Sequence, residues 1–331
     1  MEYASQLLGH RDGSIFVVKA TGLWRSRDDG LSWTRVPLPL DPPPRGRLAL
    51  ALDPWNSDVL YAPAAGGGLA RTTNSGASWE TLLAGPQRVL ALAVSPADPQ
   101  TLWAAFGLPR PTDFQLLRSR DGGFSWQVVD RASPYASFCF SRVSLLYPAP
   151  IQPDRLFASY SCAAGRTFSD VLRVSEDGGV RWRTLLRPQF AYPERLVPGI
   201  RPVEWWLVAN QDRRIGGAQL FTSDDDGATW TLRLIFPERA PRAGRPQAWE
   251  INALVIDPLQ PGRIWLGLGR STTAGIGLRT TGGAILVTTD GGAVWWEASA
   301  ALGEVTDLVL SADGRWLFAA SERGLYRQLV R

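Results

Sequence analysis

One eight-residue motif occurs six times in this chain of 331 residues. Each copy follows the pattern Ser/Thr-x-Asp/Asn-x-Gly-x-x-Trp, and the copies begin at positions 26, 72, 119, 175, 223 and 288. The six motif tryptophans are 46, 47, 56, 48 and 65 residues apart. Repetition with a period of roughly 20–50 residues is typical of an array of similar structural units. The motif therefore constrains the fold more strongly than composition does.

The motif predicts a tight turn between two strands. Its Asp or Asn can accept hydrogen bonds from nearby main-chain N–H groups, and its Gly can adopt positive φ. Short apolar segments precede and follow every copy, and the Trp begins the returning strand. We assign structural roles to the acidic or amide residue and to the Trp of each copy: Asp28, Asn74, Asp121, Asp177, Asp225, Asp290, Trp33, Trp79, Trp126, Trp182, Trp230 and Trp295.

A second pair of strand-like segments recurs upstream of the motif and completes a unit of four short strands. Seven such units cover 3–36, 47–83, 89–130, 139–187, 195–236, 249–299 and 304–329, and the last lacks the motif and its fourth strand. Radial repetition of four-stranded sheets predicts an all-β fold, a single seven-bladed β-propeller of antiparallel blades. Six blades are the alternative, and a linear solenoid would need capping ends that are not evident. The open fourth-strand position of unit seven is either filled by another chain or left as an exposed edge.

The six motifs resemble Asp-box (bacterial neuraminidase, BNR) repeats, and the resemblance covers nearly the whole chain. Families with this repeat include sialidases, xyloglucan-cleaving hydrolases, sortilin-type receptors and the photosystem II stability/assembly factors. In size, blade count and motif density the chain is most similar to the assembly-factor type. That resemblance implies one non-catalytic propeller that acts as a protein-binding scaffold.

The enzyme families provide the alternative function, a carbohydrate-binding protein or a sialidase-like glycoside hydrolase. The sialidase resemblance implies an Arg-Ile-Pro element near the N-terminus, which this sequence lacks. The xyloglucanase resemblance implies catalytic Asp residues between two propellers, whereas one propeller fits this length. On general grounds Asp113, Glu204 and Glu250 are candidates for a catalytic carboxylate pair, with solvated or ion-paired roles as the alternative. We assign no catalytic residue.

Composition removes several classes of site. His10 is the only histidine, and Cys139 and Cys162 are the only cysteines, so we expect no His-based triad, metal site or cofactor. No apolar run approaches the roughly 18 residues of a membrane-spanning helix. The formal charge is +4 (35 − 31), and only Lys19 among the basic residues is a lysine. Nucleic acid is disfavoured as a partner because the sequence has no recognised binding module.

Charge is distributed unequally between the two predicted faces of the propeller. The motifs and the turns between first and second strands form the box face; the turns between second and third strands and the links between blades form the loop face. The long loop-face segments contain 14 Arg and seven acidic residues, a charge of +7, which leaves −3 for the rest of the chain (4 − 7). One interpretation of this charge is non-functional: loops are polar, and an Arg-rich proteome places Arg in its loops.

The functional interpretation is an Arg-rich platform for an acidic protein or a segment of a membrane protein. Two long insertions, 237–249 and 269–283, extend this platform. The predicted partner-binding residues are Arg110, Arg166, Arg213, Arg214, Arg242, Arg245, Arg270, Arg279 and Trp249.

The two cysteines bear on localisation. Pairing Tyr147 with Arg155 in unit four would place Cys139 and Cys162 within one residue of opposition, so we consider them a candidate disulfide. A disulfide would place the protein outside the cytoplasm, in the periplasm, at the cell surface or in a lumen. The first residues resemble no signal peptide, although a mature chain would look the same. Two free thiols, and a cytoplasmic location, are the alternative.

Overall fold

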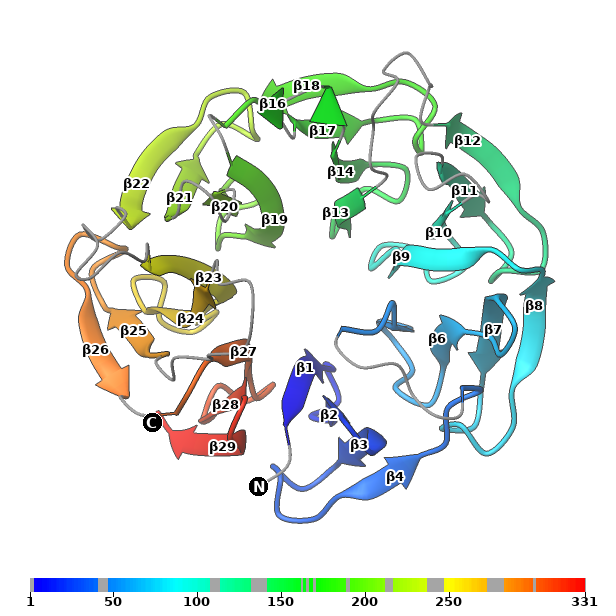
Figure 1. The fold of residues 1–331 in the computed structure, drawn as a ribbon, viewed down its shortest axis with the longest axis horizontal. Coiled ribbons are helices and arrows are strands. Elements are labelled where there is room, and N and C mark those ends of the chain that lie inside the picture. Colours follow the sequence, from blue (N-terminus) through cyan, green and yellow to red (C-terminus); the bar gives the residue numbers. More distant parts are fainter. Residues whose placement is uncertain are drawn as a thin grey trace.

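The structure, a computed structural model, describes residues 3–40, 47–107, 114–131, 142–161, 163–164, 167–168, 171–188, 191–211, 217–236, 247–272, 283–299 and 302–330. Its strands form seven small antiparallel sheets arranged as a ring about a common axis (Figure 1). This arrangement confirms the predicted seven-bladed β-propeller. No helix among the described residues has the length and apolar composition that crossing a membrane requires.

The first four blades run from the axis outward in chain order, each with four strands. Blade one contains β1 (Ala4–Gly9), β2 (Ile15–Lys19), β3 (Gly22–Ser26) and β4 (Thr34–Val36). Blade two contains β5 (Ala51–Leu52), β6 (Leu60–Pro63), β7 (Gly68–Thr72) and β8 (Glu80–Ala84). Blade three contains β9 (Arg88–Val94), β10 (Leu102–Gly107), β11 (Phe114–Ser119) and β12 (Gln127–Arg131). Blade four contains β13 (Arg142–Pro148), β14 (Leu156–Ser161), β17 (Val171–Ser175) and β18 (Arg183–Leu186), with a small hairpin, β15 (Ala163–Ala164) and β16 (Thr167–Phe168), inserted before β17.

The remaining blades follow the same order, except that three strands of blade seven lie among the described residues. Blade five contains β19 (Ala191–Pro198), β20 (Trp205–Gln211), β21 (Ala218–Ser223) and β22 (Thr231–Phe236). Blade six contains β23 (Gln247–Ile256), β24 (Ile264–Thr272), β25 (Ile285–Thr288) and β26 (Trp296–Ser299). Blade seven contains β27 (Val305–Leu310), β28 (Trp316–Ser321) and β29 (Gly324–Leu329), and β27 packs against β1 to close the ring.

The repeated motif forms the same turn in each of blades one to six, as the first copy illustrates. Ser26 Oγ donates to Asp28 Oδ1 at 2.8 Å, and the Gly30 N–H donates to Ser26 Oγ at 2.8 Å. Asp28 Oδ1 also accepts the N–H of the residue four positions later at 2.9 Å. The Trp33 indole N–H then donates to the Gly30 oxygen at 3.2 Å, whereas Trp79 is the exception and donates to blade one. These bonds explain why Ser/Thr, Asp/Asn, Gly and Trp recur at fixed spacing.

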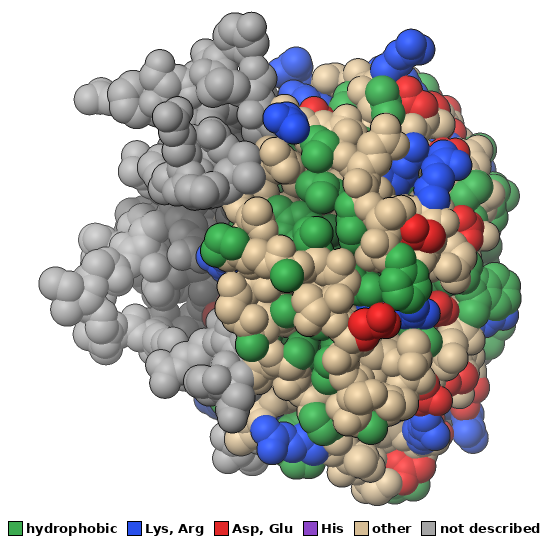
Figure 2. Space-filling model, turned by 90° about the vertical axis from the view of Figure 1, so that its right-hand side faces the viewer, with side chains coloured by type: hydrophobic (Ala, Val, Ile, Leu, Met, Phe, Trp, Pro, Cys, Tyr) green, Lys and Arg blue, Asp and Glu red, His purple; other side chains and the backbone are tan. Residues whose placement is uncertain are grey.

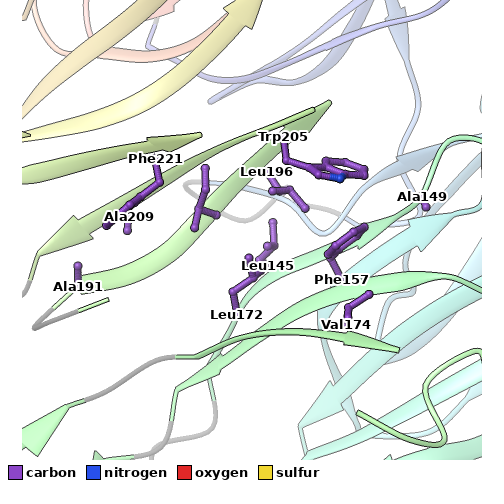
Figure 3. Packing of buried hydrophobic residues seen from close by; sticks show 11 residues of the cluster. Leu145, Ala149, Phe157, Leu172, Val174, Ala191, Leu196, Trp205, Ala209 and Phe221 are labelled. Atoms are coloured by element: carbon purple, nitrogen blue, oxygen red, sulfur yellow. The ribbon is translucent and has the colours of Figure 1, made fainter. Parts of the chain in front are cut away.

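The hydrophobic core is divided among the junctions between adjacent blades. Figure 3 shows the junction of blades four and five, where Phe157 and Trp205 lie with ring centroids 4.6 Å apart. One buried aromatic side chain occupies the same second-strand position in every blade: Phe16, Tyr61, Trp103, Phe157, Trp206, Trp265 and Phe318. Each of these seven aromatic side chains belongs to the hydrophobic cluster at the junction with the next blade.

Two local predictions were wrong. Tyr147 pairs with Phe157 and not with Arg155, and a bulge further along shifts the register by one. Cys139 and Cys162 lie outside the described residues, so the disulfide between them stays a prediction. The pairing of Tyr147 with Arg155 no longer supports it. The expected insertions 237–249 and 269–283 are also shorter than predicted, because their ends belong to β23 and β24.

Candidate binding face

The two faces of the ring are arranged as the topology requires. On the box face, the Ser75 N–H of a motif donates to the Asp58 oxygen in the first turn of the same blade at 2.9 Å. On the loop face, the Glu322 N–H in the β28–β29 turn donates to the Glu304 oxygen in the link before β27 at 3.0 Å. The loop face therefore joins blade links and second turns around the axis.

Most of the predicted partner-binding residues lie outside the described residues: Arg110, Arg166, Arg213, Arg214, Arg242, Arg245 and Arg279. The other two, Trp249 and Arg270, lie directly opposite each other in the β23–β24 ladder. These strands are longer than the first and second strands of the other blades, at 10 and 9 residues. The structure thus brings these two predicted residues together, on neighbouring strands at the loop-face end of blade six.

A charged cluster that the sequence did not reveal lies on the axis. The Asp307 side chain is 3% exposed, and its Oδ2 accepts from Arg47 Nη2 at 2.7 Å. Arg195 Nη2 lies 3.1 Å from Asp307 Oδ1. Arg47, Arg195 and Asp307 come from blades two, five and seven, so their side chains meet across the axis. We call these three residues the axial cluster.

A recurring bulge positions two members of the axial cluster. The inner strands of blades five and seven each contain an extra residue, Glu194 and Thr306, and the next residues are Arg195 and Asp307. Bulges bend a strand and change the direction of its side chains. Glutamine occupies the same place in blade one. There Gln6 Oε1 accepts the N–H of Leu48, just before the first strand of blade two, at 3.0 Å. Aligning the seven units at this position is the sequence signal that could have identified the cluster.

Burial and ion pairing act in opposite directions on Arg195 in the axial cluster. Burial lowers the pKa of the Arg195 guanidinium to about 10, although the neighbouring Asp307 carboxylate opposes this shift. Asp307 Oδ2 also accepts the main-chain N–H of Leu7 at 3.1 Å, so the carboxylate ties blade seven to blade one. Guanidinium groups from two other blades and two main-chain N–H groups thus hold the Asp307 carboxylate in place.

The other carboxylates described near the axis are also held by donors. Asn210 Nδ2 donates to Glu194 at 2.8 Å and to the Ile251 oxygen at 3.1 Å. Asn252 Nδ2 lies 3.3 Å from Glu304 Oε1. Through these two asparagines, both glutamates take part in contacts between neighbouring blades.

The three candidate catalytic carboxylates do not form a site among the described residues. Glu204 lies on the box face, where its two oxygens contact the Trp206 indole N–H at 3.0 Å and Arg201 Nε at 3.5 Å. Glu250 lies in β23 at the loop-face end, and Asp113 lies outside the described residues. Glu204 therefore has the ion-paired role that was its alternative interpretation. In the part of the chain that the structure describes, no three His, Cys, Asp or Glu side chains gather where they could hold a metal ion.

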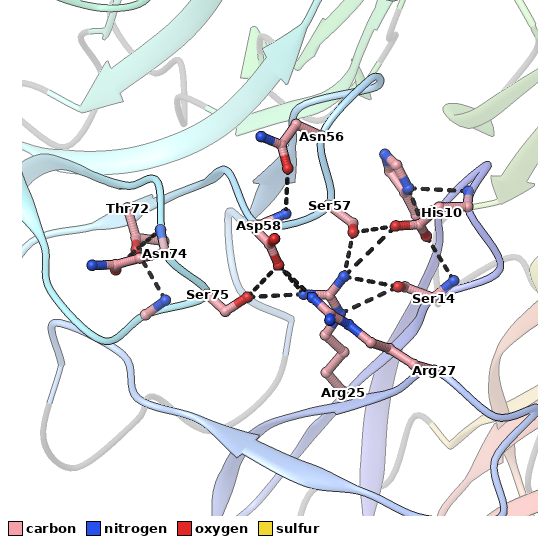
Figure 4. A network of polar contacts seen from close by, with 12 residues as sticks. His10, Ser14, Arg25, Arg27, Asn56, Ser57, Asp58, Thr72, Asn74 and Ser75 are labelled. Carbon is pink, nitrogen blue, oxygen red and sulfur yellow. Dashed lines mark hydrogen bonds and ion pairs between the residues drawn. The ribbon is translucent and has the colours of Figure 1, made fainter.

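Arginines pair with several of the acidic side chains on the box face. Arg25 is 5% exposed and links two blades through Asp58, Ser75 and Ser14 (Figure 4). Similar ion pairs occur around the ring: Arg120–Asp154, Arg155–Asp226 and Arg315–Asp29. Figure 2 shows acidic side chains close to basic ones toward the right-hand edge of the molecule. The box face thus joins blades to each other and is not a bare negative surface.

The chain matches no family model and no curated protein sequence. Among solved structures it is similar to the GH74 xyloglucanase from Xanthomonas campestris, with a TM-score of 0.73 and 19% identity over 98% of this chain and 52% of the xyloglucanase. The GH74 enzyme of Niastella koreensis gives the same TM-score of 0.73, with 16% identity and the same two coverages. The chain therefore spans about half the length of these enzymes.

Two further structures have different functions. YCF48 bound to D1 peptide has a TM-score of 0.62 and 15% identity, over 100% of this chain and 94% of YCF48. The extracellular domain of a putative one-component system, BT4673 from B. thetaiotaomicron, has a TM-score of 0.64 and 11% identity, over 98% of this chain and 38% of that one. At these identities the similarities establish the propeller fold alone.

Proposed function

We propose that this chain is a non-catalytic, Asp-box type scaffold or assembly factor that binds an acidic segment of another protein on its loop face. The observation that carries the proposal is the axial cluster, where Arg47 and Arg195 already neutralise Asp307. With these two paired internally, an acidic partner would meet the other 12 predicted loop-face arginines (14 − 2). The proposed contact residues remain Arg110, Arg166, Arg213, Arg214, Arg242, Arg245, Arg270, Arg279 and Trp249.

The similarity to YCF48 supports a peptide ligand. YCF48 was solved with a D1 peptide, and this chain covers 94% of it, as one propeller matched to another. Guanidinium groups bind carboxylates through two parallel hydrogen bonds, and a positive face accelerates the approach of an acidic partner. Binding of this kind weakens as salt concentration rises.

The test compares two variants that carry the same change of charge. Arg213→Glu, Arg214→Glu and Arg279→Glu together reverse part of the loop face. The control combines Arg181→Glu, Arg183→Glu and Arg233→Glu, three exposed arginines at the box-face end of blades four and five. We expect wild type and the control to capture the same protein from lysate and membranes of the source organism, and the loop-face variant to lose it.

The captured protein then provides a synthetic acidic peptide for titration at low and high salt. The proposal predicts weaker binding at high salt and no binding to the loop-face variant. Equal capture by both variants would refute it, provided that circular dichroism finds both folded.

Carbohydrate binding or glycoside hydrolysis is the second candidate, favoured by the TM-score of 0.73 to GH74 xyloglucanases. Incubation of the chain with xyloglucan and sialosides, beside Glu204→Gln and Glu250→Gln variants, decides this alternative. Release of sugar by wild type that is lost in either variant would replace the scaffold proposal with an enzyme.

A further inference from the structure

Blade seven is the only blade whose described sheet ends at its third strand. In blades one to six a fourth strand pairs with the third, as β4 pairs with β3 and β8 with β7. Among the described residues nothing pairs with the outer side of β29. The sequence of β29, Gly-Leu-Tyr-Arg-Gln, parallels that of β3, Gly-Leu-Trp-Arg-Ser, so the two strands occupy the same place in their blades.

The hydrogen-bonding direction of β29 follows from its ladder. The Val330 N–H donates to the Arg315 oxygen, and the β28–β29 register continues this pairing to Gln328 and Tyr326. Because antiparallel strands alternate the direction of their main-chain groups, the N–H and C=O of Leu325 and Arg327 point to the open side. The outer edge of β29 thus presents the donors and acceptors that β3 uses to bind β4.

Without a fourth strand among the described residues, one apolar side chain of β29 is left partly exposed. The residues equivalent to Leu325 in the other six blades are at most 3% exposed: Leu23, Leu69, Leu116, Leu172, Leu220 and Ile285. Leu325 alone is only partly buried. In those blades an apolar fourth-strand residue, such as Val36, joins the core at the junction with the next blade. The hydrophobic cluster between blades seven and one contains no fourth-strand residue of blade seven among its described residues.

We propose that the outer edge of β29 binds an extended segment of a second polypeptide, which adds as the antiparallel fourth strand of blade seven. The fourth strands of blades one and two provide the template for its form. Opposite Leu325 it carries Leu or Val, as Val36 lies opposite Leu23 and Leu83 opposite Leu69. Opposite Arg327 it carries an acidic residue, as Glu80 lies opposite Arg71.

Charge favours a different polypeptide over a second copy of this chain. The exposed Arg327 guanidinium donates to the main-chain oxygen of Asp29 and lies 4.5 Å from the Trp316 ring centroid. Two β29 edges facing each other would bring Arg327 and Arg323 of both copies together, and like charges on neighbouring strands are destabilising. An acidic strand has the complementary charge.

A cavity of about 250 Å³ adjoins this edge between blades six and seven. Its lining includes Leu317, Ala319, Tyr326 and Gln328. Side chains of an added strand alternate between the two faces of the sheet. The residue opposite Tyr326 would face this cavity, which gives the site a third point of recognition.

The probe is a fluorescent peptide of residues 78–85, Ser-Trp-Glu-Thr-Leu-Leu-Ala-Gly, which contains the fourth strand of blade two. We expect saturable one-to-one binding to the full chain by fluorescence anisotropy. Hydrogen exchange at Leu325 and Arg327 should slow when the peptide binds, whereas Tyr326 and Gln328 should change little because β28 already protects them. This pattern of alternate residues distinguishes strand addition from other contacts.

Variants test the charge contact and the main-chain contact separately. Arg327→Glu should weaken binding about fivefold, and a peptide with Glu80→Lys should restore it. Arg327→Pro removes an N–H that points to the open side while keeping the bonds to β28, so it should abolish binding in a folded protein. The thermal midpoint of each variant reports its folding.

Three results would overturn the proposal. The first is no saturation with millimolar peptide, and the second is binding that both Arg327 variants leave unchanged. The third is a dimer that protects Leu325 and Arg327 without peptide, since a second copy would then occupy the edge. The inference is independent of the proposed loop-face function, because the variant with Arg213→Glu, Arg214→Glu and Arg279→Glu should bind this peptide normally.

Discussion

Replacing Asp307 with alanine should destabilise the ring by about 3–5 kcal/mol, because it leaves a buried guanidinium without its counter-charge. Asp307 is 3% exposed and the Arg195 side chain 20% exposed, so little water can replace the carboxylate. The substitution also removes the acceptor for the Leu7 N–H. For 331 residues the entropy of unfolding is about 0.7 kcal/mol/K, from about 2.1 cal/mol/K per residue. The expected fall in the thermal midpoint is therefore about 4–7 °C.

A double-mutant cycle identifies the cause. Adding Arg195→Met to Asp307→Ala removes the unpaired charge, so the double variant should be more stable than Asp307→Ala alone. Differential scanning calorimetry of wild type, both single variants and the double variant measures the coupling. An Asp307→Ala midpoint equal to that of wild type, or a double variant whose losses simply add, would refute the assignment of Arg195 and Asp307 as a coupled pair.

Three further predictions concern the blades. Hydrogen bonds from the motif lower the pKa of Asp121 from 3.8 to about 2, so the stability that its charge provides is present above about pH 4 and is lost as pH falls toward 2. The difference in thermal midpoint between wild type and Asp121→Asn should therefore shrink over that range, and a constant difference would contradict this prediction. Gly30→Ala should destabilise the protein more than Gly13→Ala, although both glycines have positive φ, because a Cβ at Gly30 would lie 2.8 Å from the Phe318 ring, whereas a Cβ at Gly13 would have no atom within 4 Å. Equal denaturation midpoints for the two variants would count against the importance of the Phe318 contact. Trp103→Phe should cost about 1–3 kcal/mol in urea denaturation, since its buried indole N–H bonds a carbonyl of the next blade at 2.9 Å, and a negligible change would mean that the bond contributes nothing.

The sequence predicted the fold well because the information is local and repeated. Each motif encodes its own turn through the side chain of an Asp such as Asp28 and a Gly at positive φ such as Gly30. The six motifs, together with the strand pair that recurs upstream of them and once more near the C-terminus, indicate seven blades. Register was harder, because inner-strand bulges such as the one between Val143 and Leu145 shift the pairing by one residue and carry no consistent residue type.

The axial cluster could not be predicted in the same way. Asp307 is a single carboxylate whose partners Arg47 and Arg195 are 260 and 112 residues away in the sequence (307 − 47 and 307 − 195). Only closure of the ring brings them together, so no pattern within a single unit marks them. An alignment of all seven units at the bulge would have been needed. The contacts of Glu204, in contrast, are local, because its partners Arg201 and Trp206 lie within three residues in the sequence.

A ring made from a linear chain has one junction that no peptide link crosses, and here it lies between β27 and β1. The other six junctions are spanned by covalent links, and their outer strands add apolar contacts. This junction depends on side-chain and main-chain contacts such as Thr306 to the Ala4 oxygen at 2.7 Å, Asp307 to Leu7, and Arg327 to Asp29. Under tension applied to its two ends, the propeller should therefore open at this junction first and then unfold one blade at a time from the two ends.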